Sequence, residues 1–155
     1  MTFGLQIPST TLGRNESTGA WTLCLPTPGA SNQVRALAPS SSLAVNEWLA
    51  NALPGEPDWV ELFNQDPVRP VALEGLRLVT PQGIHRFAGP SFVRPGGFQV
   101  FLADNERGAD HFNFKLPARA GFLELQDPEG ILLDRVEYAE AREGVSDGRW
   151  PDGGA

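Results

Sequence analysis

The residues of this 155-residue sequence that could do chemistry are two histidines, one cysteine and several loop carboxylates. Catalysis needs a nucleophile with a base, a carboxylate pair in a cleft, or a metal, and each leaves a recognisable spacing. The sequence has no G-x-S-x-G, P-loop, H-E-x-x-H or strand-linked G-x-G-x-x-G motif. His85 lies between Ile84 and Arg86 in a short β-prone segment, which favours a solvent-facing side chain. His111 has the same interpretation, so we expect no catalytic residues.

One loop brings together oxygen-bearing side chains of the kind that calcium prefers: Asp104, Asn105, Glu106 and Asp110. Their spacing does not match an EF-hand loop, and a solvated acidic loop is the alternative interpretation. We expect no bound cofactor, with calcium as the one candidate.

Tryptophans offer a different chemistry, because exposed rings can stack on a sugar or a peptide. Trp48, Trp59 and Trp150 are the candidates for such a platform, together with Phe92. Large aromatic residues usually fill the interior of a small β-domain, which is the alternative. Two or more exposed in one patch would favour the binding platform.

Composition limits the class of protein. The formal net charge is −7, with Lys115 as the single lysine and no basic cluster, so we expect no nucleic-acid partner. A hydrophobic content of 41% with Gly 17 and Pro 14 suits a soluble all-β domain, and no apolar run approaches the roughly 18 residues of a membrane span. Cys24 is alone, which rules out an internal disulfide and, with two distant histidines, a Cys/His zinc site. The first residues do not predict a signal peptide.

The elements that must position these residues are short strands separated by turn signals. We expect seven strands, at residues 43–50, 59–64, 75–79, 84–87, 98–102, 122–126 and 132–138. This pattern predicts a two-layer antiparallel sandwich rather than a parallel α/β sheet, with no convincing helix. Strand parity predicts an interior made of Val60, Leu62, Leu76, Leu78, Val100, Leu123, Leu125 and Val136.

Several of these segments carry motifs in a fixed order. Asn46-Glu47 lies in the first strand, and residues 58–64 read D-x-V-E-L-x-N. Residues 71–78 follow as a third strand, then 113–116 as N-F-x-L and 127–134 as D-x-x-G-x-x-x-D. In order and spacing, the chain from about Leu43 to Asp152 resembles the lamin-tail domain family of bacterial type. The resemblance implies an immunoglobulin-like antiparallel β-sandwich.

The N-terminal residues resemble the segment that closes such a domain. Gly13-Arg14, Trp21 and the P-T-P-G-x-x-N run at residues 26–32 match it, and residues 146–153 begin the same segment at the other end. The resemblance therefore implies three parts. These are the closing segment of a preceding copy (1–32), a linker (33–42) and a lamin-tail-like domain (43–155).

Three residues are expected to have structural roles. Asp134 shares strand parity with the apolar residue Val136, so its carboxylate should turn partly inward and need donors. Arg149 should donate to backbone carbonyls or a carboxylate from an ordered turn. Residues 20–25 alternate like an unpaired strand, so we expect them to dock on the sandwich edge with Trp21 as the anchor. Docking within the chain gives a monomer, and docking on a neighbour gives an arm-swapped dimer.

The resemblance implies a non-catalytic module of a larger, secreted or cell-surface bacterial protein. It would serve as a spacer or as a unit that contacts protein or glycan, with the other domains of the parent chain as partners. A dedicated carbohydrate-binding module using the tryptophans is the alternative, and part of a hydrolase is a distant one.

Overall fold

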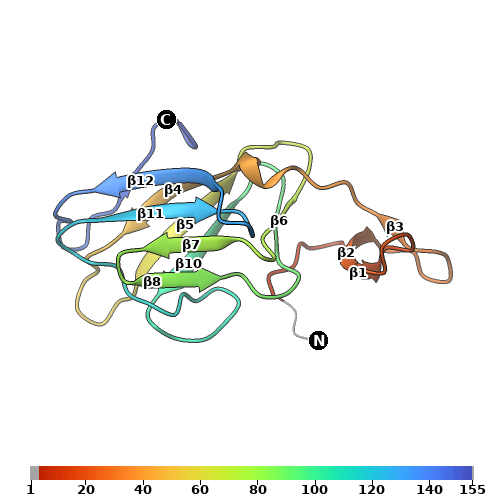
Figure 1. Cartoon of the computed structure of the whole chain (residues 1–155), viewed down its shortest axis with the longest axis horizontal. Helices are drawn as coiled ribbons and strands as arrows, with labels where there is room; N and C mark the ends of the chain where they lie inside the picture. The colour runs from red at the N-terminus through yellow and green to blue at the C-terminus, as the bar shows by residue number, and fades with distance from the viewer. Residues whose placement is uncertain (1–3, 155) are drawn as a thin grey trace.

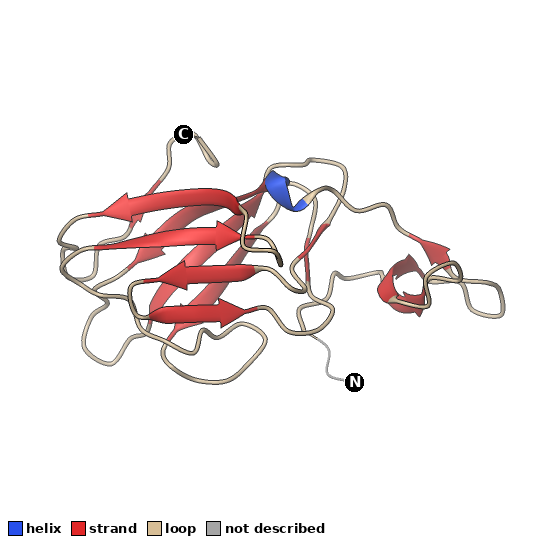
Figure 2. Cartoon of the chain, in the orientation of Figure 1, coloured by secondary structure: helices blue, strands red, loops and turns tan. Residues whose placement is uncertain are grey.

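The computed structural model describes residues 4–154, which form β-strands, turns and loops with one short 3-10 turn at Ser40–Ser42. No α-helix occurs among these residues (Figure 2). Two four-stranded antiparallel sheets and a two-stranded ribbon form one larger part, which we call the body (residues 38–154). A three-stranded antiparallel sheet at residues 11–34, which we call the arm, lies beside one end of it (Figure 1). The prediction of an all-β, antiparallel protein is confirmed.

The first sheet of the body has the strand order β10 (Phe98–Ala103), β5 (Asp58–Asn64), β4 (Leu43–Leu49) and β13 (Asp147–Gly148). The second has the order β12 (Leu132–Tyr138), β11 (Gly121–Gln126), β7 (Arg77–Thr80) and β8 (Gly83–Arg86). The ribbon pairs β6 (Val71–Ala72) with β9 (Phe92–Val93). All seven predicted strands of the body are present within two residues at each end, whereas β9 and β13 were not predicted. Two residues are too few to show an alternation. The strand that the resemblance implies at residues 71–78 is divided into β6 and the start of β7, with a turn between them.

The hairpin of β4 and β5 is the centre of the first sheet. Its register shifts between Val45 and Glu47, so Asn46 is an extra residue in a bulge. Asn46 is only 4% exposed, and its amide is satisfied on both sides. Its Nδ2 donates to Glu61 Oε1 at 3.1 Å, and its Oδ1 accepts the Gly153 N–H at 2.9 Å. The bulge therefore holds the C-terminal segment against β4.

Asn64 ends β5 and ties three segments together. It is fully buried, and its Nδ2 donates to the carbonyls of Arg69 and Arg94 at 2.9 and 3.1 Å. Its Oδ1 accepts the Asp66 N–H at 3.0 Å, which begins a polar turn after this strand. A buried amide needs this many partners because an unpaired polar group in the interior is costly.

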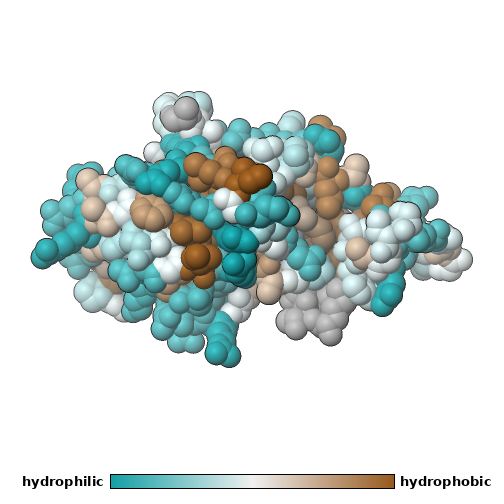
Figure 3. Space-filling view, viewed as in Figure 1, coloured by the Kyte–Doolittle hydropathy of each residue, from teal (hydrophilic) through white to brown (hydrophobic). Residues whose placement is uncertain are grey.

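The core lies between the two sheets and contains the inward residues of both, as the sequence predicts, with one exception. Val100 was expected inside and is 40% exposed, whereas its neighbours Phe101 and Ala103 are fully buried. Aromatic rings fill one side of this core, where Phe112 stacks on Phe101 at 5.1 Å between centroids and on Phe114 at 5.3 Å. On the outside, the face over β12, β11, β7 and β8 is mainly hydrophilic, with hydrophobic residues in small separate patches (Figure 3).

The arm differs from its prediction. Its strand β2 (Trp21–Leu25) pairs with β1 (Thr11–Arg14) on one side and β3 (Gln33–Val34) on the other, and not with the body. Trp21 is 40% exposed, with the Arg14 guanidinium 5.2 Å from its ring, so it does not anchor the strand to the body. The expected linker at residues 33–42 begins inside β3.

The residues before the arm are hydrogen-bonded to the body. The Phe92 N–H donates to the Leu5 carbonyl at 2.9 Å, and the Gly4 N–H donates to the Pro90 carbonyl at 3.1 Å. Among the described residues, no helix is long and apolar enough to cross a membrane.

Candidate functional site

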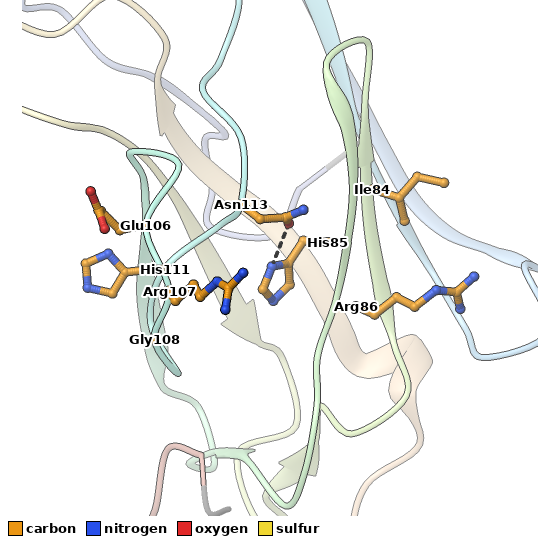
Figure 4. A pocket seen from close by; sticks show the side chains of 8 residues that line it. All are labelled: Ile84, His85, Arg86, Glu106, Arg107, Gly108, His111 and Asn113. Carbon is orange, nitrogen blue, oxygen red and sulfur yellow. Dashed lines mark hydrogen bonds between the residues drawn. The ribbon is translucent and has the colours of Figure 1, made fainter.

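A groove of about 380 Å³ lies between β8 and the segment that follows β10, at the open side of the two sheets. We call it the β8 groove. Its lining residues are Ile84, His85, Arg86, Glu106, Arg107, Gly108, His111 and Asn113 (Figure 4). One wall is an edge strand and the other is a loop, so the site brings together side chains about 20 residues apart in the sequence.

His85 forms the floor of the groove at the end of the aromatic core. It lies opposite Leu78 in the β7–β8 pair and therefore points toward the interior rather than into solvent, which corrects its prediction. Its ring meets those of Phe87 and Phe112 edge-on, each with centroids 5.0 Å away. Burial lowers the pKa of His85, and the hydrogen bond between its Nδ1 and Asn113 Oδ1 at 3.2 Å raises it only in part. The lowered pKa favours the neutral imidazole.

The opposite wall is held by its own polar groups. His111 Nδ1 lies 2.8 Å from Asp104 Oδ2, and Asp104 Oδ1 accepts the Glu106 N–H at 3.0 Å. Partial burial raises the pKa of Asp104, but these two hydrogen bonds and the charge interaction with His111 lower it, and the net shift is downward. Leu102 fixes the wall to β10, because its N–H donates to the Asp110 carbonyl at 2.8 Å.

Two arginines flank the groove without a carboxylate partner. Arg107 extends across the groove toward His85, and Arg86 points to the outer side of β8 (Figure 4). Both are exposed, and neither forms an ion pair or hydrogen bond with another residue in the 4–154 range. Three other arginines of the body, Arg69, Arg135 and Arg149, are each paired with a carboxylate. The two unpaired guanidinium groups are thus free to bind an external acceptor.

The backbone of β8 also faces the groove with unpaired groups. β8 is an edge strand, paired with β7 alone. The Phe87 N–H donates to the Leu76 carbonyl at 3.0 Å, so the backbone N–H and C=O of Phe87 point toward β7. Because these directions alternate along a strand, the backbone N–H and C=O of His85 point toward β7 as well. The backbone N–H and C=O groups of Ile84 and Arg86 consequently point away from β7, and within the described part of the chain they have no hydrogen-bond partner.

The calcium candidates Asp104, Asn105, Glu106 and Asp110 lie in or beside the far wall of this groove. In the described residues, no group of three or more His, Cys, Asp or Glu side chains is placed to hold a metal ion. The physical reason is local: both carboxylate oxygens of Asp104 already accept hydrogen bonds from the loop itself. Asn105 adopts a left-handed φ of 68° in the same turn.

The three tryptophan candidates lie in three different surroundings. Trp48 is buried in the core, 6.1 Å from the ring of Tyr138. Trp59 is half-buried in a hollow that Leu53 and Leu102 also line. Trp150 is 94% exposed. Trp48 is therefore unavailable for stacking on a ligand.

Asp134 and Arg149 are brought together between the two sheets. Asp134 Oδ1 accepts from Arg149 Nη2 at 2.8 Å, and its Oδ2 accepts the Val45 N–H at 2.7 Å. The two side chains are 15% and 14% exposed. Because Asp134 belongs to β12 and Val45 to β4, the carboxylate links one sheet to the other.

Chemically, the β8 groove offers hydrogen-bond donors and acceptors, two imidazoles and the carboxylate of Glu106. None of its lining residues is a serine, threonine or cysteine, and the sole cysteine, Cys24, is buried in the arm. Sequence reasoning missed Arg86, Arg107 and Asn113 as site residues. They have no motif spacing, and the pairing of β8 with β7 alone decides that they share a groove.

No protein-family model matches this chain, and no curated protein matches it.

Proposed function

We propose that this chain is a non-catalytic, lamin-tail-like module with an immunoglobulin-like sandwich, part of a larger bacterial protein that is secreted or at the cell surface. Its role is to contact a protein or glycan, or to space the domains on either side of it. The observation that carries this proposal is the β8 groove, which presents unpaired donors and acceptors but no serine, threonine or cysteine among its lining residues.

The remainder of the body supports a binding role through its rigidity. The two sheets share one continuous core, and the buried amide side chains of Asn46 and Asn64 beside it are hydrogen-bonded, although Trp48 Nε1 and Tyr138 Oη within it have no partner among the described residues. A site built on strands of such a scaffold keeps its geometry when a ligand arrives, which reduces the entropy lost on binding.

A glycan partner has one observation in its favour. Trp150 is 94% exposed, and an exposed indole is the usual surface for stacking on a sugar ring. A protein partner is favoured by the free backbone groups of Ile84 and Arg86, which match a peptide better than a sugar. The two partners therefore involve different surfaces of the module.

The test is a parallel search for both kinds of partner with the purified chain. We expect a random-peptide display library or a glycan array to yield ligands. Binding of peptides should be lost in the Ile84→Pro variant, and binding of glycans should be lost in Trp150→Ala. Turnover of an ester, peptide or glycoside substrate that is abolished by His111→Gln would refute a non-catalytic role.

A further inference from the structure

We propose that the β8 groove binds an extended acidic peptide segment of a partner protein, which adds to β8 as a further strand. This rests on the proposed function and names its partner class. The first observation is the free edge. Ile84 and Arg86 each present one N–H and one C=O away from β7, and none of these groups has a partner in residues 4–154.

The spacing of these groups fits a peptide backbone. Alternate residues of a strand lie about 6.8 Å apart, so the groups of Ile84 and Arg86 match those of alternate residues in an added strand. Such a strand lies about 4.8 Å from its neighbour, on the side of β8 where the groove opens. A sugar chain has no such alternation of donors and acceptors. Strand addition is the recognition mode that these unpaired groups favour.

The loop on the far side of the groove encloses the space beside the free edge of β8. Residues 106–113 face β8 across it, and Leu102 holds this segment to β10 through hydrogen bonds with Asp110 and Phe112 at 2.8 and 2.7 Å. The volume of about 380 Å³ lies within the range of about 300–1,000 Å³ typical of ligand sites. An added strand would therefore fit a preformed space instead of an open sheet edge.

The free guanidinium groups at the groove indicate that the partner segment carries acidic residues. In an added strand, the residue opposite His85 points inward, and Arg107 extends toward the same space (Figure 4). A carboxylate there can accept from the Arg107 guanidinium, which has no carboxylate partner within the described chain. A second acidic residue opposite Arg86 would meet that side chain on the outer face. The lining has two arginines against one carboxylate, Glu106, so it is formally more positive than the chain as a whole, whose net charge is −7.

The test uses a synthetic peptide with the chemistry that the groove requires. The probe is acetyl-Val-Thr-Val-Asp-Val-Thr-Val-amide, and its matched control has Asn in place of Asp. Titration into the full chain labelled with ¹⁵N should shift the backbone amides of Ile84 and Arg86 and slow their hydrogen exchange. The Asn peptide should bind about tenfold more weakly, since it loses the charge-assisted bond.

Variants of the chain separate the two contacts. Arg107→Gln should weaken the Asp peptide by about tenfold and leave the Asn peptide unchanged, whereas Arg119→Gln, an exposed arginine outside the groove, should change neither. Ile84→Pro should abolish binding of both peptides, because it removes the free N–H without touching the bonds to β7. Ile84→Thr, which keeps the N–H, should bind both.

Amides of Ile84 and Arg86 that stay unshifted at about 5 mM peptide, or equal affinity for the Asp and Asn peptides, would overturn this proposal. The proposed function would survive if library peptides or glycans bound elsewhere on the module, and only catalytic turnover would remove it.

Discussion

At the scale of single residues, the Asp134–Arg149 pair shows how a carboxylate can hold two sheets together. The Val45 N–H and the Arg149 guanidinium both donate to Asp134, which is only 15% exposed. The parity of β12 predicts this inward orientation from sequence, since Val136 and Tyr138 on the same face are buried. The partner Val45 could not be predicted, because it depends on how the second sheet lies over the first.

We expect Asp134→Asn to lower the free energy of unfolding by about 1.5–3 kcal/mol, because hydrogen bonds to a charged acceptor are replaced by weaker neutral ones. Thermal and urea denaturation measure this. Glu129→Gln, at an exposed turn, is the matched control and should change stability by less than about 0.5 kcal/mol. If Arg149→Met costs as much in the Asp134→Asn background as in the parent, the two residues are not coupled.

His85 provides a prediction about pH. Burial lowers its pKa below the ordinary value of 6.5, so the unfolded chain binds the proton more readily than the folded chain. Stability should therefore fall as the pH drops below about 6.5, until the folded imidazole is protonated as well. Urea midpoints at pH 7.5 and 5.5 measure this loss. His85→Gln should flatten the profile in this window, and an unchanged slope would assign the effect to other groups.

The sequence predicted His85 as solvent-facing because its neighbours Ile84 and Arg86 are mixed in polarity. Both of those side chains in fact point outward, and His85 takes the inward position of the strand. The parity that His85 shares with Phe87, two residues later, is the one local sign of this position. The second ring, Phe112, belongs to a distant segment, so its contact with His85 depends on the fold.

At the scale of elements, β10 shows why strand parity can mislead. Its two faces are Phe98, Val100 and Leu102 on one side and Gln99, Phe101 and Ala103 on the other, so both are largely apolar. The alternation therefore does not choose between them. The structure buries Phe101 and Ala103, because Phe101 stacks on Phe112 in the aromatic part of the core.

This assignment predicts different costs for neighbouring residues. Phe101→Ala should lower the free energy of unfolding by about 3–5 kcal/mol, as is usual for a fully buried phenylalanine. Val100→Thr should cost less than about 1 kcal/mol, because the side chain is 40% exposed and threonine keeps the β-branch. Urea denaturation of the two variants measures both values. Equal losses would mean that Val100 lies inside, as its sequence pattern indicates.

In the arm, the strand β2 pairs with short neighbouring strands that the sequence does not predict. Its strand β2 was correctly expected from the alternation of residues 20–25, but its neighbours were not. β1 contains Gly13 and Arg14, and β3 has two residues, so neither resembles a strand in sequence. These short local partners satisfy both edges of β2, which removes the reason for it to dock on the body.

At the scale of the whole molecule, the chain divides into parts of very different size. The core cluster of the body begins at Ala38 and includes no residue of the arm, and Leu5 is the one residue from position 4 to position 37 that packs against it. Leu23 and Cys24 are fully buried in the arm, outside that cluster. A unit of the arm's size, below about 40 residues, has little core of its own and is expected to open more readily than the body.

The last prediction separates the arm from the segment that ties it to the body. Leu23→Asp places a charge at a fully buried position, so we expect hydrogen exchange in residues 11–34 to lose its protection. The melting temperature of the body should stay within about 2 °C of the parent, since its core has no contribution from the arm. Deletion of residues 1–35 should cost about 1–2 kcal/mol, because it also removes Leu5 and its hydrogen bond with Phe92. Should Leu23→Asp destabilise the body as much as the deletion does, the arm would be part of the same cooperative unit, and docking of β2 would have to be reconsidered.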